Sequence, residues 1–144
     1  MTKELHILIV EDDIDDYLLL SEVLNKELGK VKINWTKDGE DCLDYLYRKN
    51  KYANEQVSMP DIIFLDLNMP VKNGMEVLHV LKFDTLMKKI PILVFSTSND
   101  DKDVRDSYER GANSYIVKPS DYDSYKRIAA VIHKYWLENV CLPT

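Results

Sequence analysis

The sequence has little of the residues that mark specialised protein classes, with two cysteines, four glycines and three histidines among 144 residues. Cys42 and Cys141 are far apart and belong to no Cys-x-x-Cys or Cys/His pattern. This argues against a disulfide scaffold and against structural zinc, and it fits a reducing compartment. The low glycine and proline content excludes a collagen or a low-complexity chain.

The sequence also lacks a basic excess and a long apolar run. Nineteen Lys and Arg residues stand against 25 Asp and Glu residues, a net charge of −6 at pH 7, so no general positive field attracts nucleic acid or anionic lipid. No apolar stretch approaches the roughly 18 residues that span a bilayer, and the first residues do not form a secretory signal. We expect a soluble cytoplasmic protein whose partners are proteins or cations, with no nucleic acid and no membrane.

What is present is an alternation of short apolar runs with stretches of helical periodicity. The runs are apolar on both faces, which is typical of strands buried in a parallel sheet. The stretches between them repeat apolar residues at the spacing of helices packed on such a sheet. The pattern predicts one doubly wound, three-layer α/β domain. Strands are expected at 6–10, 31–35, 60–66, 90–95 and 114–117, and the last helix at 122–137.

Chemically active side chains are concentrated where the predicted strands end. In chain order they are Glu11, Asp12, Asp13, Asp66, Ser96 and Lys118. Because the carboxyl ends of parallel strands share one edge of a sheet, we expect these side chains to gather there. Crowded carboxylates repel one another unless a cation lies among them, and Mg²⁺ prefers oxygen ligands. Since no Cys or His follows a predicted strand, a soft metal is disfavoured and magnesium is predicted.

The same strand ends resemble the receiver domain of two-component response regulators. The matching segments are VEDD at 10–13, LDLNMP at 65–70 with Gly74 after it, Ser96, and YIVKP at 115–119. The resemblance extends over residues 5–137. It implies a flavodoxin-like fold with five parallel strands in the order 2-1-3-4-5. It also implies a single receiver domain over 1–144, in which 138–144 form a short carboxyl-terminal extension.

The resemblance implies a role for each acidic residue of the cluster. Asp66 is the phosphoacceptor, which takes a phosphoryl group from a phosphohistidine of a sensor histidine kinase. Asp12 and Asp66 bind Mg²⁺ directly, Glu11 acts largely through a water, and the backbone carbonyl of Asn68 is a further ligand. Phosphoryl transfer depends mainly on positioned groups and neutralised charge, so these residue types suit the reaction.

The resemblance also implies a switch. Ser96 and Lys118 stabilise the phosphoryl group, and the Lys118–Pro119 bond is expected to be cis. Ser96 moves toward the phosphoryl group while Tyr115 swings inward, which alters the surface of the fourth helix, the fifth strand and the last helix. The alternative for Tyr115 is a half-buried strand aromatic without a switching role.

Three acidic residues near the first strand have a simpler interpretation. Asp13, Asp15 and Asp16 favour the positive amino end of the first helix, rather than a metal ion.

Two peripheral segments resemble the single-domain regulators that are paired with bacterial and cyanobacterial phytochromes. They are YLYRKNKY at 45–52 and the ending at 135–143. This resemblance implies a phytochrome kinase as the phosphoryl donor and a homodimer built on the carboxyl-terminal face. Trp136 and Val140 are expected to contribute to that interface.

Three other functions compete with a phosphoacceptor switch that is not an enzyme. A metal-dependent phosphatase that works through an aspartyl phosphate resembles Asp-x-Asp after the first strand, whereas Asp66 follows the third and Asn68 replaces the second acid. A scaffold that never carries phosphate would have lost Asp66 or Lys118, and both are present. A flavodoxin-like electron carrier needs a phosphate-cradling loop after the first strand, where the acidic residues would repel phosphate.

Overall fold

The computed structural model describes residues 4–143 and forms one parallel five-stranded sheet. The strands are β1 (Leu5–Val10), β2 (Val31–Thr36), β3 (Ile62–Leu65), β4 (Ile92–Ser96) and β5 (Ser114–Val117). Their order is β2-β1-β3-β4-β5 and every pair is parallel, which confirms the predicted fold. The chain winds outward in both directions from β1 and β3, so the loops after these two strands meet at the switch point of the sheet.

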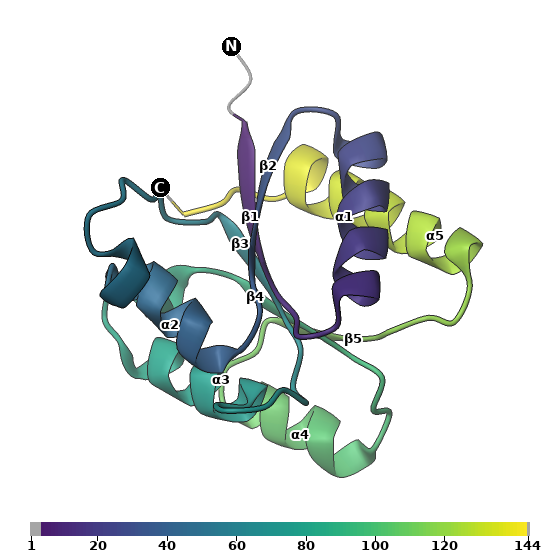
Figure 1. The fold of residues 1–144 in the computed structure, drawn as a ribbon. Helices are drawn as coiled ribbons and strands as arrows, with labels where there is room; N and C mark the ends of the chain where they lie inside the picture. The colour runs from purple at the N-terminus through teal and green to yellow at the C-terminus, as the bar shows by residue number, and fades with distance from the viewer. Residues whose placement is uncertain (1–3, 144) are drawn as a thin grey trace.

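Helices cover both faces of the sheet (Figure 1). One layer contains α1 (Ile14–Leu28) and α5 (Tyr122–Ile132), and the other contains α2 (Gly39–Tyr47), α3 (Gly74–Phe83) and α4 (Asp101–Glu109). None of the helices in the described part of the chain has the length and apolar character needed to cross a bilayer.

The sheet is apolar on both sides because each helical layer needs its own core. Along β3, Ile62 and Phe64 pack in the cluster beneath α1 and α5, whereas Ile63 and Leu65 pack in the cluster beneath α2 and α3. All four side chains are essentially inaccessible to water. This two-sided burial is the physical origin of the continuous apolar runs in the sequence.

Side-chain caps begin the five α-helices and so mark where each strand-to-helix loop stops. The capping residues are Asp13, Asp38, Asn73, Asp100 and Asp121, each of which accepts a hydrogen bond from a backbone N–H of the first helical turn. Such caps contribute about 1 kcal/mol each. They also keep most strand-to-helix loops short, since α1, α2, α4 and α5 each start within five residues of a strand end, whereas the loop from Leu65 to Gly74 is longer.

Strand boundaries differ from the predicted ones where prolines interrupt the pairing. The strand expected at 60–66 pairs only over Ile62–Leu65, and the strand expected at 90–95 pairs over Ile92–Ser96. Pro60 and Pro91 precede these strands and have no N–H to donate to the ladder. Short 3₁₀ turns at Asn50–Tyr52 (η1) and Met87–Lys89 (η2) lie before the two strands and were not predicted.

The last helix differs from the predicted one in its winding. An α-helix over 122–137 was expected, but α5 ends at Ile132 and a wider π-helical segment, η3 (His133–Asn139), follows it. The backbone N–H of Val140 donates to the carbonyl of Tyr135 at 3.0 Å, five residues back, as in a π-turn. Residues 1–3 and Thr144 lie outside the described residues, so the predicted domain limits at 1 and 144 are untested.

Gly74 is required by the close approach of α3 to the end of β3. A Cβ atom at this position would lie 2.2 Å from the carbonyl oxygen of Asp66 and 2.7 Å from Cα of Leu67. We predict that Gly74→Ala lowers the free energy of unfolding by roughly 1–3 kcal/mol in urea denaturation, because the loop must move to admit the methyl group. As a control, Ile14→Ala at the exposed first position of α1 should change it by no more than about 0.5 kcal/mol. Equal stability of Gly74→Ala and the unaltered protein would contradict the close packing.

Candidate functional site

The turn after β1 is held rigidly by its neighbours. The backbone N–H of Glu11 donates to the carbonyl of Thr36 on β2 at 3.0 Å, and the indole N–H of Trp35 donates to the carbonyl of Glu11 at 2.7 Å. Trp35 also stacks on Tyr17 of α1, with ring centroids 4.5 Å apart. The Glu11 side chain is therefore positioned from β1, β2 and α1 together.

The loop after β3 places Asp66 opposite this turn. Its backbone N–H donates to the carbonyl of Val10 at 3.1 Å, which continues the β1–β3 ladder by one residue. The backbone N–H of Asn68 donates to the Asp66 carboxylate at 3.4 Å. The residues Asp66 and Glu11 are only 5% and 3% exposed, whereas Asp12 is exposed to solvent. One carboxylate oxygen from each of these three acidic residues lies within 4.8 Å of the other two.

Lys118 reaches the cluster from the end of β5. Its backbone N–H donates to the carbonyl of Ser96 on β4 at 2.7 Å, which fixes the position of the Lys118 backbone. The ammonium lies 2.6 Å from Glu11, 3.0 Å from Asp16 and 3.5 Å from Asp66. With a side chain only 5% exposed, Lys118 joins four elements in one buried ion-pair network.

The expectation that the Lys118–Pro119 bond is cis is wrong for this structure. No peptide bond between described residues is cis, and the trans form is the ordinary state of an X-Pro bond. The trans backbone together with the Ser96 hydrogen bond already directs the lysine into the acidic cluster.

Burial and charge oppose each other in this network. Burial raises the pKa of Glu11 well above its usual range, more than the hydrogen bond from Lys118 lowers it. Burial also raises the pKa of Asp66, while the Lys118 charge partly offsets the shift. Burial alone would lower the pKa of Lys118, but its hydrogen bond to Glu11 and the charge of Asp66 outweigh this and raise it. One ammonium is thus too little positive charge for the carboxylates around it.

The donor set fits a hard divalent cation. Glu11, Asp12 and Asp66 offer only oxygen atoms, and their spacing allows all three to face one ion. Such an ion would supply the missing positive charge and would draw the equatorial oxygens of a phosphoryl group toward Asp66. The structure gives no contact between Asn68 and this cluster other than its N–H bond to Asp66, so the Asn68 carbonyl ligand stays a prediction.

The two expected switch residues lie beside the cluster on β4 and β5. Ser96 is fully buried at the end of β4, and its hydroxyl accepts a hydrogen bond from the N–H of Ser98 at 3.3 Å. Tyr115 is half-buried, packs against the core beneath α3 and donates from its hydroxyl to the Ser98 carbonyl at 2.8 Å. The Ser98 backbone therefore contacts both residues, and the switching role itself stays a prediction.

Two residues near the site have contacts that the sequence interpretation missed. Asp13 does cap α1, as expected for an acidic residue at a helix start, but Asp16 also pairs with Lys118. No pattern in the sequence indicated this pairing. Tyr108 of α4 accepts a hydrogen bond at 3.1 Å from the backbone N–H of Tyr115 on the sheet edge, and no motif pointed to that contact.

Comparison with known proteins identifies the family. The pattern of the response regulator receiver domain matches residues 7–130. The chain belongs to the response regulator receiver domain family. Receiver domains act as phosphoacceptor switches in two-component signalling, and phosphorylation on an aspartate with bound Mg²⁺ is typical of them.

The relatives of this receiver include regulators associated with phytochromes. The chain is 36% identical to the response regulator Rcp1 of Synechocystis sp. over 137 residues, which cover 95% of this chain and 92% of Rcp1. The structure of the phosphorylated cyanobacterial phytochrome response regulator RcpA matches with a TM-score of 0.91 and 36% identity, covering 99% of this chain and 100% of that one. The Mn²⁺-bound form of Rcp1 matches with a TM-score of 0.87 and 35% identity, covering 96% and 99%. These comparisons, together with the oxygen cluster, support divalent metal binding by the acidic pocket of this receiver.

Asp12 should be needed for metal binding although it contributes little to the fold. We predict that Asp12→Asn weakens the binding of Mg²⁺ or Mn²⁺, measured by isothermal titration calorimetry, roughly tenfold or more, because one of three converging carboxylates is lost. The matched control is Asp15→Asn in the same acidic segment, which should stay within about twofold because the general field falls off quickly in salt. An equal loss of metal affinity in the two variants would mean that the acidic residues after β1 attract cations only through their general charge.

Proposed function

We propose that this receiver accepts a phosphoryl group on Asp66 in a Mg²⁺-dependent reaction and switches a protein-interaction surface. The observation that carries the proposal is the convergence of Asp66, two further acidic residues and the Lys118 ammonium at one sheet edge. Such a set combines a nucleophile with the positive charge that a transferred phosphoryl group needs. It argues against a scaffold that never carries phosphate, because none of the required side chains is missing.

The chemistry follows from the position of each side chain. A carboxylate oxygen of Asp66 attacks the phosphorus of a phosphohistidine, the phosphorus–nitrogen bond breaks, and the imidazole leaves with the bonding pair and takes up a proton. Lys118, 3.5 Å from Asp66, is placed to pair with the incoming phosphoryl oxygens. We propose that the hydroxyl of Ser96 turns from its contact with the Ser98 N–H to donate to one of these oxygens.

The proposed switch acts through the loop between β4 and α4. If Ser96 moves toward the phosphoryl group, its contact with the Ser98 N–H at 3.3 Å is lost, and the hydrogen bond from Tyr115 to the Ser98 carbonyl is disturbed. Ser98 also donates to Asp103 of α4 at 2.7 Å. A change at Asp66 therefore has a short path of direct contacts to the α4–β5 surface.

The partner class follows from the family and its relatives. A response regulator takes its phosphoryl group from a sensor kinase. The similarity to the cyanobacterial phytochrome response regulator RcpA supports a phytochrome as that kinase. We propose that the protein works in the cytoplasm, where a reducing environment suits the free Cys42 and Cys141.

We also propose a homodimer built on the carboxyl-terminal segment. Val131, Tyr135 and Leu137 are exposed on α5 and η3 although their side chains are large and apolar. Trp136 is half-buried against the core beneath α5, and Val140 is half-buried at the end of η3. Trp136 would therefore contact both the core of its own subunit and the partner. The exposed apolar side chains around it favour association.

Asp66 should be the one residue that carries the phosphoryl group. After incubation with Mg²⁺ and acetyl phosphate, we expect a hydroxylamine-sensitive phosphoryl adduct on Asp66 by mass spectrometry. Asp66→Asn should remove it, and Asp101→Asn, an exposed acidic residue of α4, should leave it unchanged. Labelling of Asp66→Asn to the same extent, or no adduct on the unaltered protein, would refute the proposed function.

The interface can be tested by light scattering at micromolar concentration, with and without phosphorylation. We expect a dimer in at least one of the two states, and a monomer for Val140→Glu, because a buried unpaired charge is costly. Phe83→Glu places the same charge on an exposed residue of α3 and should keep the dimer. A monomer in both states of the unaltered protein would exclude the dimer.

A further inference from the structure

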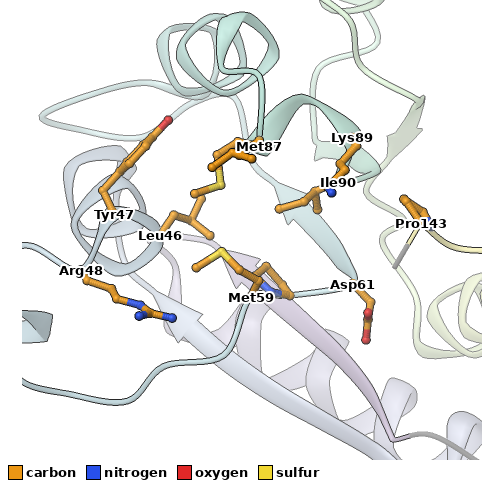
Figure 2. A pocket seen from close by; sticks show the side chains of 11 residues that line it. Leu46, Tyr47, Arg48, Met59, Asp61, Met87, Lys89, Ile90 and Pro143 are labelled. Atoms are coloured by element: carbon orange, nitrogen blue, oxygen red, sulfur yellow. The ribbon is translucent and has the colours of Figure 1, made fainter.

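A cavity of about 570 Å³ lies at the edge of the sheet opposite to Asp66, where β3 and β4 begin (Figure 2). Three segments form most of its walls, namely the end of α2, the residues that precede β3 and the η2 turn before β4, and Pro143 of the carboxyl-terminal segment completes them. Its size lies in the range of small-molecule sites, which are roughly 300–1,000 Å³. None of its lining residues belongs to the acidic cluster, so its chemistry is separate from phosphoryl transfer.

The interior of this cavity is apolar. Figure 2 shows Leu46, Met59, Met87 and Ile90 directed toward the same space from the three segments. Leu46, Met87 and Ile90 are buried in the protein core, while Met59 is 37% exposed. Two methionines, one from the segment before β3 and one from the η2 turn, favour an aliphatic or aromatic ligand of variable shape, because the unbranched thioether side chain adapts easily.

Two cationic side chains, Arg48 and Lys89, lie at the entrance of the cavity. Arg48 ends α2 with a left-handed backbone conformation, and its guanidinium donates to the carbonyl of Val57 at 3.2 Å, which holds the side chain beside the cavity with further donors available. Lys89 lies on the other side in Figure 2. Among residues 4–143 the Lys89 ammonium has no ion pair and no hydrogen bond.

The acidic groups near the cavity are already bound by the protein. Asp61 accepts a hydrogen bond from the backbone N–H of His6 at 2.9 Å. Asp84 accepts one from the hydroxyl of Tyr47 at 2.7 Å and two more from backbone N–H groups of the η2 turn. Although the whole chain has a net charge of −6, two cations, Arg48 and Lys89, line this cavity against one carboxylate, Asp61.

We propose that this cavity binds a small amphipathic carboxylate, with its aliphatic or aromatic body among the methionines and its carboxylate at the cavity entrance, which Arg48 and Lys89 border. The apolar walls supply the binding free energy of the body. The guanidinium supplies a planar pair of donors that matches a carboxylate, and the lysine adds charge. An uncharged or cationic ligand with the same body would lack these contacts at the head group.

Decanoate serves as the probe for this site, with decanol and decylammonium as head-group controls. In two-dimensional NMR of the full chain with labelled methionine methyl groups, we expect decanoate to shift Met59 and Met87. Decanoate should bind roughly tenfold more tightly than octanoate, because two more methylenes are buried. Arg48→Gln and Lys89→Gln should each weaken decanoate binding about two- to fivefold and leave decanol binding unchanged, as expected for partly exposed ion pairs.

A matched pair of charge insertions tests the location. Leu86 lines the mouth and is 70% exposed, and Phe83 is 79% exposed but does not line the cavity. Leu86→Glu should abolish decanoate binding by repulsion, and Phe83→Glu should leave it within about twofold, while both variants fold normally since neither side chain is buried. The proposal is overturned if decanoate shifts only residues outside the cavity, if decylammonium binds as tightly as decanoate, or if the two Glu variants behave alike.

Discussion

The site depends on one buried ammonium that several carboxylates share. Lys118 contacts Glu11, Asp16 and Asp66 within 3.5 Å from the end of β5. Burial raises the pKa values of Glu11 and Asp66 more than the neighbouring Lys118 ammonium lowers them. The same imbalance makes the cluster receptive to a divalent cation, whose charge together with that of Lys118 would offset the charge of an incoming phosphoryl group.

The topology of the sheet connects the acidic cluster to the surface of α4 and β5. Asp66 and Lys118 stand at the ends of β3 and β5, and Ser96 ends the strand between them. The hydroxyl of Ser96, the Ser98 backbone and Tyr115 are linked by direct hydrogen bonds. In a tightly packed α/β domain, a small movement at such a junction shifts a neighbouring helix because the core has no space to absorb it. The surface that would report phosphorylation is therefore built from elements that already touch the acceptor site.

The two edges of the sheet have opposite electrostatic character. The edge at the carboxyl ends gathers acidic groups around one lysine. The edge at the amino ends encloses an apolar cavity that two cations, Arg48 and Lys89, and one carboxylate, Asp61, border. Both edges belong to the same strands, so a ligand at one and a phosphoryl group at the other would act on a common core.

Local sequence patterns were enough to predict the fold and the acidic cluster. Apolar runs that are buried on both faces, together with capping residues such as Asp13 and Asn73, give the alternation of strands and helices. Residues that directly follow strands, such as Asp66 and Lys118, meet at one edge in any parallel sheet of this order, and the resemblance to receivers singled them out as a candidate site.

Contacts between distant elements were decided only by the tertiary structure. The pairing of Asp16 with Lys118 and the contact of Tyr108 with the β5 edge join residues whose separation in space no periodicity encodes. The π-helical winding of 133–139 was likewise not indicated by any local pattern. The sequence by itself determined which side chains stand at the strand ends, because strand polarity follows from chain order. Only the folded packing decided which of them share the buried ammonium, because that depends on side-chain reach and on exclusion of water.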